Sequence, residues 1–92
     1  MKSMRVKVGH VHVVVRWEKG LSRVAGVAGV SGVDLQDVRI DDDLGPDVER
    51  ETVLHELLHH ALTQTVLEKM FTDEQEEQVI WGLSPLILQM WR

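Results

Sequence analysis

The sequence predicts an α+β domain in which a small, mostly antiparallel sheet packs against two helices. Three observations predict this class. Valine-rich segments alternate with polar residues in the first half of the chain. A stripe of leucines at helical spacing follows Pro46, and a second helix start at Thr72 precedes an apolar carboxyl end.

Length and composition fit one small domain that spans residues 1–92. The chain has 92 residues, of which 43% are hydrophobic and 27% are charged, and this composition is typical of a globular protein. It contains no cysteine. Disulfides and thiol nucleophiles are therefore excluded, and a metal would have to be bound by histidine and carboxylate side chains.

The net charge of −5 is unevenly distributed along the chain. Residues 1–33 carry six basic side chains and one acidic one, whereas residues 34–92 carry four basic and fourteen acidic ones. We interpret the two ranges as solvated faces of one domain, with contact to an anionic partner as the alternative. Trp17 is the only aromatic residue of the basic range, so we predict no nucleic-acid binding.

No segment is long and apolar enough to span a membrane. The longest apolar run, Val79–Trp91, covers 13 residues and is interrupted by polar and helix-breaking residues, whereas a span needs about 20. The amino end lacks the continuous apolar stretch of a signal peptide. We therefore expect a cytoplasmic protein without a membrane partner.

The strands are expected in the first half. The alternation from Val6 to Val15 predicts either a tight hairpin that turns at Gly9-His10 or one long strand kinked at the glycine. A second pair of strands is expected at Val27–Val33 and Asp37–Asp41, joined by a turn at residues 34–36. The alternation within Asp37–Asp41 is typical of a half-buried strand at an edge of the sheet.

The first helix is expected to begin at Pro46, which suits the first helical position, and to continue to about Glu68. Its apolar stripe consists of Leu54, Leu57, Leu58, Ala61, Leu62 and Thr65. The second helix begins at a capping box formed by Thr72 and Gln75, and Pro85 predicts a kink or a break near Ser84.

The end of the second helix is apolar on nearly all sides, which predicts a homo-oligomer interface. The residues concerned are Leu86, Ile87, Leu88, Met90 and Trp91. We interpret the large aromatic residues as core or helix-capping residues rather than walls of a ligand pocket. These are Trp17, Phe71, Trp81 and Trp91, and Met90 is interpreted in the same way.

The first helix carries the motif His-Glu-Leu-Leu-His at residues 55–59. Histidines four residues apart share one helix face, so His55 and His59 can bind one Zn²⁺ while Glu56 reaches a water on that metal. Zinc lowers the pKa of such a water to about 7, and the glutamate accepts its proton. The motif predicts a zinc-dependent peptidase, with Glu56 as general base and a protein or peptide as substrate.

A catalytic zinc usually has three protein ligands. No third histidine follows at the spacing of an extended motif, so the remaining donors are the glutamates at the start of the second helix, Glu74, Glu76 and Glu77. By helical phase Glu76 shares a face with Val79 and Ile80 and points inward, whereas Glu77 shares one with Ile80 and Trp81. Spacing alone leaves both glutamates open as the third ligand.

The other histidines are interpreted as residues that bind no metal. His10 and His12 are expected to be ordinary strand residues, with a metal-binding pair as the alternative. His60 lies one position away from the metal-binding face and is expected to be partly exposed.

From about Asp34 to Met90 the chain resembles small phage- and prophage-encoded zinc peptidases of the ImmA/IrrE-like kind. The resemblance is carried by three segments, Val38–Asp41, Glu51–His59 and Glu76–Leu86. It implies a minimal zincin fold and a gluzincin site, in which His55 and His59 bind zinc and Glu56 is the base. The family's third ligand maps onto Glu77, which we favour over Glu76. A phage-encoded member would act in the host cytoplasm.

The alternative function is that of a metal-binding or catalytically idle phage accessory module that acts by docking on another protein. A chain of 92 residues has few residues with which to form a deep substrate-binding cleft, and this favours the docking module.

Overall fold

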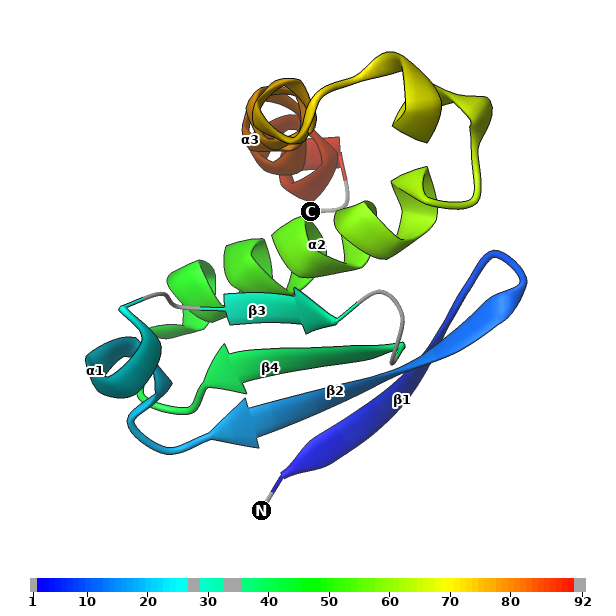
Figure 1. Ribbon diagram of the computed structural model, residues 1–92. Helices are drawn as coiled ribbons and strands as arrows, with labels where there is room; N and C mark the ends of the chain where they lie inside the picture. The colour runs from blue at the N-terminus through cyan, green and yellow to red at the C-terminus, as the bar shows by residue number, and fades with distance from the viewer. Residues whose placement is uncertain (1, 27–28, 33–35, 91–92) are drawn as a thin grey trace.

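The computed structural model describes residues 2–26, 29–32 and 36–90 (Figure 1). The described strands are β1 (Ser3–Val8), β2 (Val11–Glu18), β3 (Gly29–Gly32) and β4 (Asp37–Asp41). The helices are α1 (Leu21–Ala25), α2 (Pro46–Leu62), the short 3₁₀ helix η1 (Val66–Met70) and α3 (Asp73–Met90). The predicted α+β class is confirmed.

The four strands form one sheet in the order β1-β2-β4-β3. Two of the three strand pairs are antiparallel, and β2 pairs with β4 in parallel. The prediction that Asp37–Asp41 is an edge strand is wrong, because β3 lies outside it. Of its polar residues, Arg39 is exposed and pairs with Glu18, whereas Asp41 is buried and accepts a hydrogen bond from the Ser22 backbone N–H. The predicted turn at residues 34–36 lies largely outside the described residues.

The Gly9-His10 segment is a two-residue turn, so β1 and β2 form the predicted hairpin. Gly9 has a φ of +60°, which favours glycine. The side chain of Gln64 holds this turn, because it accepts a hydrogen bond from the His10 backbone N–H at 2.8 Å and donates one to the Val8 carbonyl at 2.7 Å. The hairpin tip is thereby tied to the segment that follows α2.

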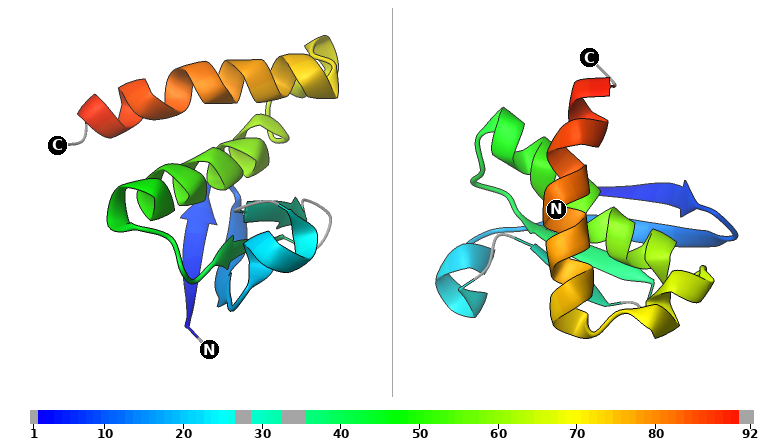
Figure 2. Two further views of the ribbon diagram at one scale, coloured as in Figure 1. Left: turned by 90° about the vertical axis from the view of Figure 1, so that its left-hand side faces the viewer. Right: turned by 90° about the horizontal axis from the view of Figure 1, so that it is seen from above.

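The molecule has three layers, namely the sheet, α2 on one of its faces, and α3 crossing over α2 (Figures 1 and 2). Inward-facing residues of β2 and β4 form the core, and Val53 and Leu57 of α2 pack against them. The buried core residues are Val13, Val15, Trp17, Val38 and Ile40. The interior position of Trp17 is as predicted.

Helix α2 begins at Pro46 as predicted, but it ends at Leu62 rather than near Glu68. The chain turns at Thr63, whose hydroxyl donates to the carbonyl of His60 at 2.8 Å. Threonine side chains compete in this way with the helical hydrogen-bond pattern. The early end lets η1 reverse the chain, so that α3 returns across α2 (Figure 2).

Helix α3 begins at the predicted capping box, because Gln75 N–H donates to the Thr72 hydroxyl at 3.1 Å and Thr72 N–H donates to the Gln75 side chain at 3.0 Å. Of the predicted kink or break near Ser84, the break is wrong, because α3 continues through Pro85. Pro85 lies on the exposed side of the helix, whereas Ser84 is fully buried and its hydroxyl donates to the Ile80 carbonyl at 2.6 Å.

Helix α3 carries several large apolar side chains that are exposed to solvent. The most exposed are Trp81, Leu83, Leu86 and Met90. Within the described part of the chain, no helix combines the length and the apolar character needed to cross a bilayer.

Candidate metal centre

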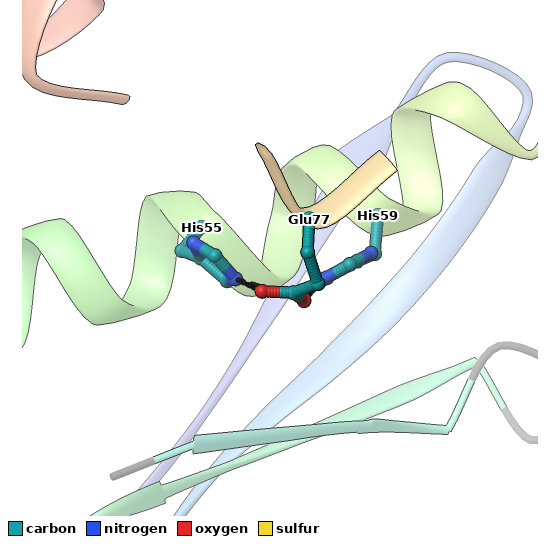
Figure 3. A group of neighbouring side chains, drawn as sticks. All are labelled: His55, His59 and Glu77. Atoms are coloured by element: carbon teal, nitrogen blue, oxygen red, sulfur yellow. Dashed lines mark hydrogen bonds and ion pairs between the residues drawn. The ribbon is translucent and has the colours of Figure 1, made fainter. Parts of the chain in front are cut away.

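Two histidines of α2 and one glutamate of α3 converge where the two helices cross (Figure 3). His55 and His59 lie one turn apart on the same helix face, and their ring centroids are 5.1 Å apart. The Nε2 atoms of both rings face the carboxylate of Glu77, at 3.2 Å for His55 and 2.7 Å for His59. The structure thus brings together the three residues predicted to bind the metal.

Glu77 approaches the histidines from the second turn of α3. Burial alone would raise the pKa of its carboxyl group, but hydrogen bonds from His55 and His59 and their charges outweigh burial, and the pKa of Glu77 is lowered. The carboxylate is therefore ionised at neutral pH, which is the form that binds a cation.

The donor set and its spacing fit a zinc ion. Two imidazoles and one carboxylate, with a fourth position left open, are the ligands of one class of catalytic zinc site. Bond lengths of about 2.1 Å in a tetrahedron place the donor atoms about 3.4 Å apart. The separation of 3.2 Å between His55 and Glu77 is close to this value. The contact of 2.7 Å between His59 and Glu77 is a direct hydrogen bond and would lengthen by roughly 0.7 Å on metal binding.

Glu76 contacts the opposite side of the His59 ring. Its Oε2 atom lies 2.7 Å from His59 Nδ1, and its side chain is 18% exposed, against 46% for Glu77. A carboxylate at Nδ1 accepts that N–H, so that Nε2 can bind a metal in place of the proton that it donates to Glu77. The two glutamates that spacing left open therefore lie on two sides of one histidine, and the one facing both Nε2 atoms is Glu77.

His55 has a different environment from His59. Its Nδ1 atom is buried and has no hydrogen-bond partner among the residues that the structure describes. The indole of Trp81 lies against the imidazole, with 4.8 Å between the ring centroids. Packing against Trp81 thus orients His55, whereas a hydrogen bond orients His59.

Glu56, the predicted base, is buried and lines the same cavity as His55 and Glu77. Gly29 of β3 lies directly beside it, because a Cβ atom at this glycine would be 3.1 Å from Glu56 Cγ and 2.8 Å from Thr52 Cγ2. Glycine at this position lets β3 approach α2 closely. Glu56 is therefore enclosed between the helix and the sheet, next to the two histidines.

The cavity has a volume of about 520 Å³. Its lining combines residues of α2, α3 and β3, namely Gly29, Val48, Glu51, Thr52, His55, Glu56, Glu77 and Trp81. Sequence reasoning missed Val48, Glu51 and Thr52, although their spacing from the motif indicates that they lie beside His55. They precede His55 by seven, four and three residues and so share its helix face.

The interpretation of Trp81 as a core or capping residue is wrong. Its side chain is 58% exposed and forms a wall of the cavity. The spacing contained a hint, because Trp81 lies four residues after Glu77 and shares its helix face.

The expectation that His60 is partly exposed is also wrong. The residue is 1% exposed, and its Nε2 atom lies 3.2 Å from the carbonyl oxygen of Asp37. With Val53 and Leu57 it follows the i, i+4, i+7 spacing of the helix face that packs on the sheet. It contacts β4 rather than the candidate metal centre, as predicted for a histidine that is not a ligand.

The buried positions of α2 also differ from the predicted leucine stripe. Those leucines are only half-buried, whereas the buried residues of α2 are His55, Glu56 and His60. Burial of polar groups costs free energy unless they are paired. The helix thus uses its most enclosed positions for polar groups rather than for apolar packing.

His10 and His12 are exposed in the hairpin, and His10 occupies its turn. In the described ranges, the only group of histidine and acidic side chains close enough to share an ion is that of His55, His59 and Glu77. The metal-binding pair weighed for the hairpin has no third donor there.

Comparison with known proteins gives no relative, because the chain matches no protein-family model, no curated protein and no solved structure.

Proposed function

We propose that the chain is a zinc-dependent peptidase whose metal is bound by His55, His59 and Glu77. The observation that carries the proposal is the convergence of both Nε2 atoms on one carboxylate, with Glu56 lining the same cavity. When bound, zinc supplies Lewis acidity toward a carbonyl oxygen and makes a water more acidic. A gluzincin of the ImmA/IrrE-like kind has the same set of residues.

Glu56 is the residue that moves protons in this proposal. Its carboxylate accepts a proton from the attacking water, and the carboxyl group then gives that proton to the nitrogen of the departing amine, so that one water is consumed for each bond broken. The enclosure of Glu56 between α2 and β3 limits the access of bulk water. His59 keeps its Nε2 atom directed at the metal because Glu76 binds the opposite ring nitrogen.

Metal analysis and a cleavage assay test the proposal together. The purified protein, loaded with one equivalent of zinc, should cleave a mixture of unstructured peptides, and chelation should abolish cleavage. The Glu56→Gln variant should retain one equivalent of zinc and lose hydrolysis by at least about 100-fold, the usual contribution of a general base. Zinc bound at well below one equivalent, or cleavage that survives in Glu56→Gln, would overturn the proposal.

The exposed apolar face of α3 favours the second candidate function, that of a docking module. The same Glu56→Gln variant separates the two functions. Biological activity that persists in this variant indicates docking, and its loss with fold and zinc retained indicates catalysis.

A further inference from the structure

We infer that the cavity beside the candidate metal centre selects a lysine or arginine side chain next to the bond that is cleaved. This inference rests on the proposed function, because it takes the position of the scissile bond from His55, His59 and Glu77. It assigns a role to Glu51, Val48 and Trp81, which line the cavity and are not needed for the chemical step.

Glu51 supplies the carboxylate that would pair with a positively charged group of the substrate. It is half-buried and lines the cavity one turn before His55. Among the described residues it makes no hydrogen bond or ion pair. The nearest basic residue along the helix, Arg50, pairs with Asp47 at the surface at 3.2 Å. A carboxylate in such a position gains most from a ligand that brings a cation.

The net charge of the cavity supports the same conclusion. Three carboxylates line it, those of Glu51, Glu56 and Glu77, and no lysine or arginine of the described ranges does. A divalent ion offsets two of these charges, and Glu51 accounts for the third. The loaded site therefore favours a substrate that carries one positive charge near the reacting atoms and disfavours an acidic one.

The apolar walls indicate that the cation is carried on a long side chain. Val48 is 52% exposed and Trp81 is 58% exposed, and both belong to the cavity lining. Lysine and arginine cover apolar surface with their methylene stems while the charged head reaches a polar partner. The indole face of Trp81 adds a cation–π surface for the head group.

The spacing along α2 fits such a side chain. Val48, Glu51 and His55 lie at i, i+3 and i+7, so the cavity extends along one helix face away from the metal centre. One turn of helix, about 5.4 Å, separates Glu51 from His55. The four-carbon stem of lysine spans a comparable distance.

The test uses peptides that differ at one position. A single sequence carries lysine, arginine, norleucine or glutamate beside the cleaved bond, and mass spectrometry identifies the bond. We expect kcat/KM for the lysine and arginine peptides to exceed that for norleucine by about tenfold, with the glutamate peptide slowest. In Glu51→Gln the ratio of lysine to norleucine should fall toward one. Glu74→Gln is the matched control, because it removes the same charge from an exposed residue of α3 outside the cavity lining, and its ratio should equal that of the wild type.

A binding measurement keeps this inference separate from the proposed function. The same four peptides are titrated into zinc-loaded Glu56→Gln protein. Tighter binding of the lysine peptide without any cleavage by the wild type would sustain the inferred preference and overturn the peptidase. Cleavage without a preference for basic residues, or a preference that persists in Glu51→Gln, would overturn the inference and leave the peptidase standing. Equal binding of all four peptides would overturn the inference whatever the outcome of the cleavage assay.

Discussion

Replacing the two adjacent glutamates of α3 one at a time tests whether they have different roles. Glu77 faces the Nε2 atoms of both histidines, whereas Glu76 contacts only Nδ1 of His59. Loss of a residue that orients a metal ligand weakens metal binding by about 10- to 100-fold. Loss of the ligand itself should cost more. We therefore expect Glu77→Gln to weaken zinc binding by more than about 100-fold.

The magnitude for Glu76→Gln follows from the hydrogen bond that it changes. Glutamine keeps an oxygen that accepts the His59 N–H, so the substitution converts a charge-assisted bond into a neutral one. A hydrogen bond to a charged group contributes about 1.5–3 kcal/mol, and one between neutral groups about 0.5–1.5 kcal/mol. The substitution should therefore cost about 1–1.5 kcal/mol of the free energy that holds His59 in place. Solvent screens this bond little, because the Glu76 side chain is only 18% exposed. The expected loss of zinc affinity is roughly 5- to 13-fold, and Glu76→Ala should lose more than Glu76→Gln.

Competition with a chromophoric zinc chelator at pH 7 measures both affinities on one scale. Glu74→Gln is the control, because its side chain is exposed at the start of α3. Equal affinities for Glu76→Gln and Glu74→Gln would refute the role assigned to Glu76. An equally large loss in the Glu76 and Glu77 variants would refute the distinction between ligand and orienting residue.

Three further predictions concern other parts of the molecule. A hydrogen bond from the Ser22 side chain, followed by those from the backbone N–H groups of Asp43 and Ser22, lowers the pKa of the Asp41 carboxyl group from 3.8. Its stabilisation is therefore present above pH 3.8 and lost as the pH falls through the lowered pKa, so the Tm difference between wild type and Asp41→Asn should shrink below about pH 4. Gly9→Ala should cost about 1–3 kcal/mol of unfolding free energy in urea titrations, because φ is +60° and the new Cβ would clash with Gln64. A cost near zero would refute this account of the turn. The predicted self-association through the apolar end of α3 should appear in light scattering as a mass above the monomer that Leu86→Lys lowers, and a monomeric wild type would refute it.

Local chemistry made the beginnings of elements predictable. Pro46 and the Thr72/Gln75 pair act on the residues next to them, so the starts of α2 and α3 follow from sequence alone. The HExxH spacing likewise fixed the relation of His55 to His59, because one helix positions both. When all residues of a motif lie in one helix, the helix itself fixes their relative positions.

Features that depend on contacts between elements were predicted less well. The burial of His60 and the exposure of Trp81 are set by how the three layers pack. The choice between Glu76 and Glu77 is of the same kind. One residue of helix phase is about 100°, so the tilt of α3 on α2 decides which carboxylate faces the Nε2 atoms.

The tie between Gln64 and the hairpin has a consequence for how the site is built. It anchors the end of α2 to β1 and β2, and the Trp17 indole N–H donates to Glu49 at 2.9 Å near the start of the same helix. The two histidines therefore lie on a helix that is hydrogen-bonded to the sheet near both of its ends. Glu77, in contrast, lies on α3, which packs mainly on α2. A metal ion bound by His55, His59 and Glu77 would cross-link α2 and α3. The anchoring of α3 would then rise with the logarithm of free zinc concentration, and its amide hydrogen exchange would report metal supply.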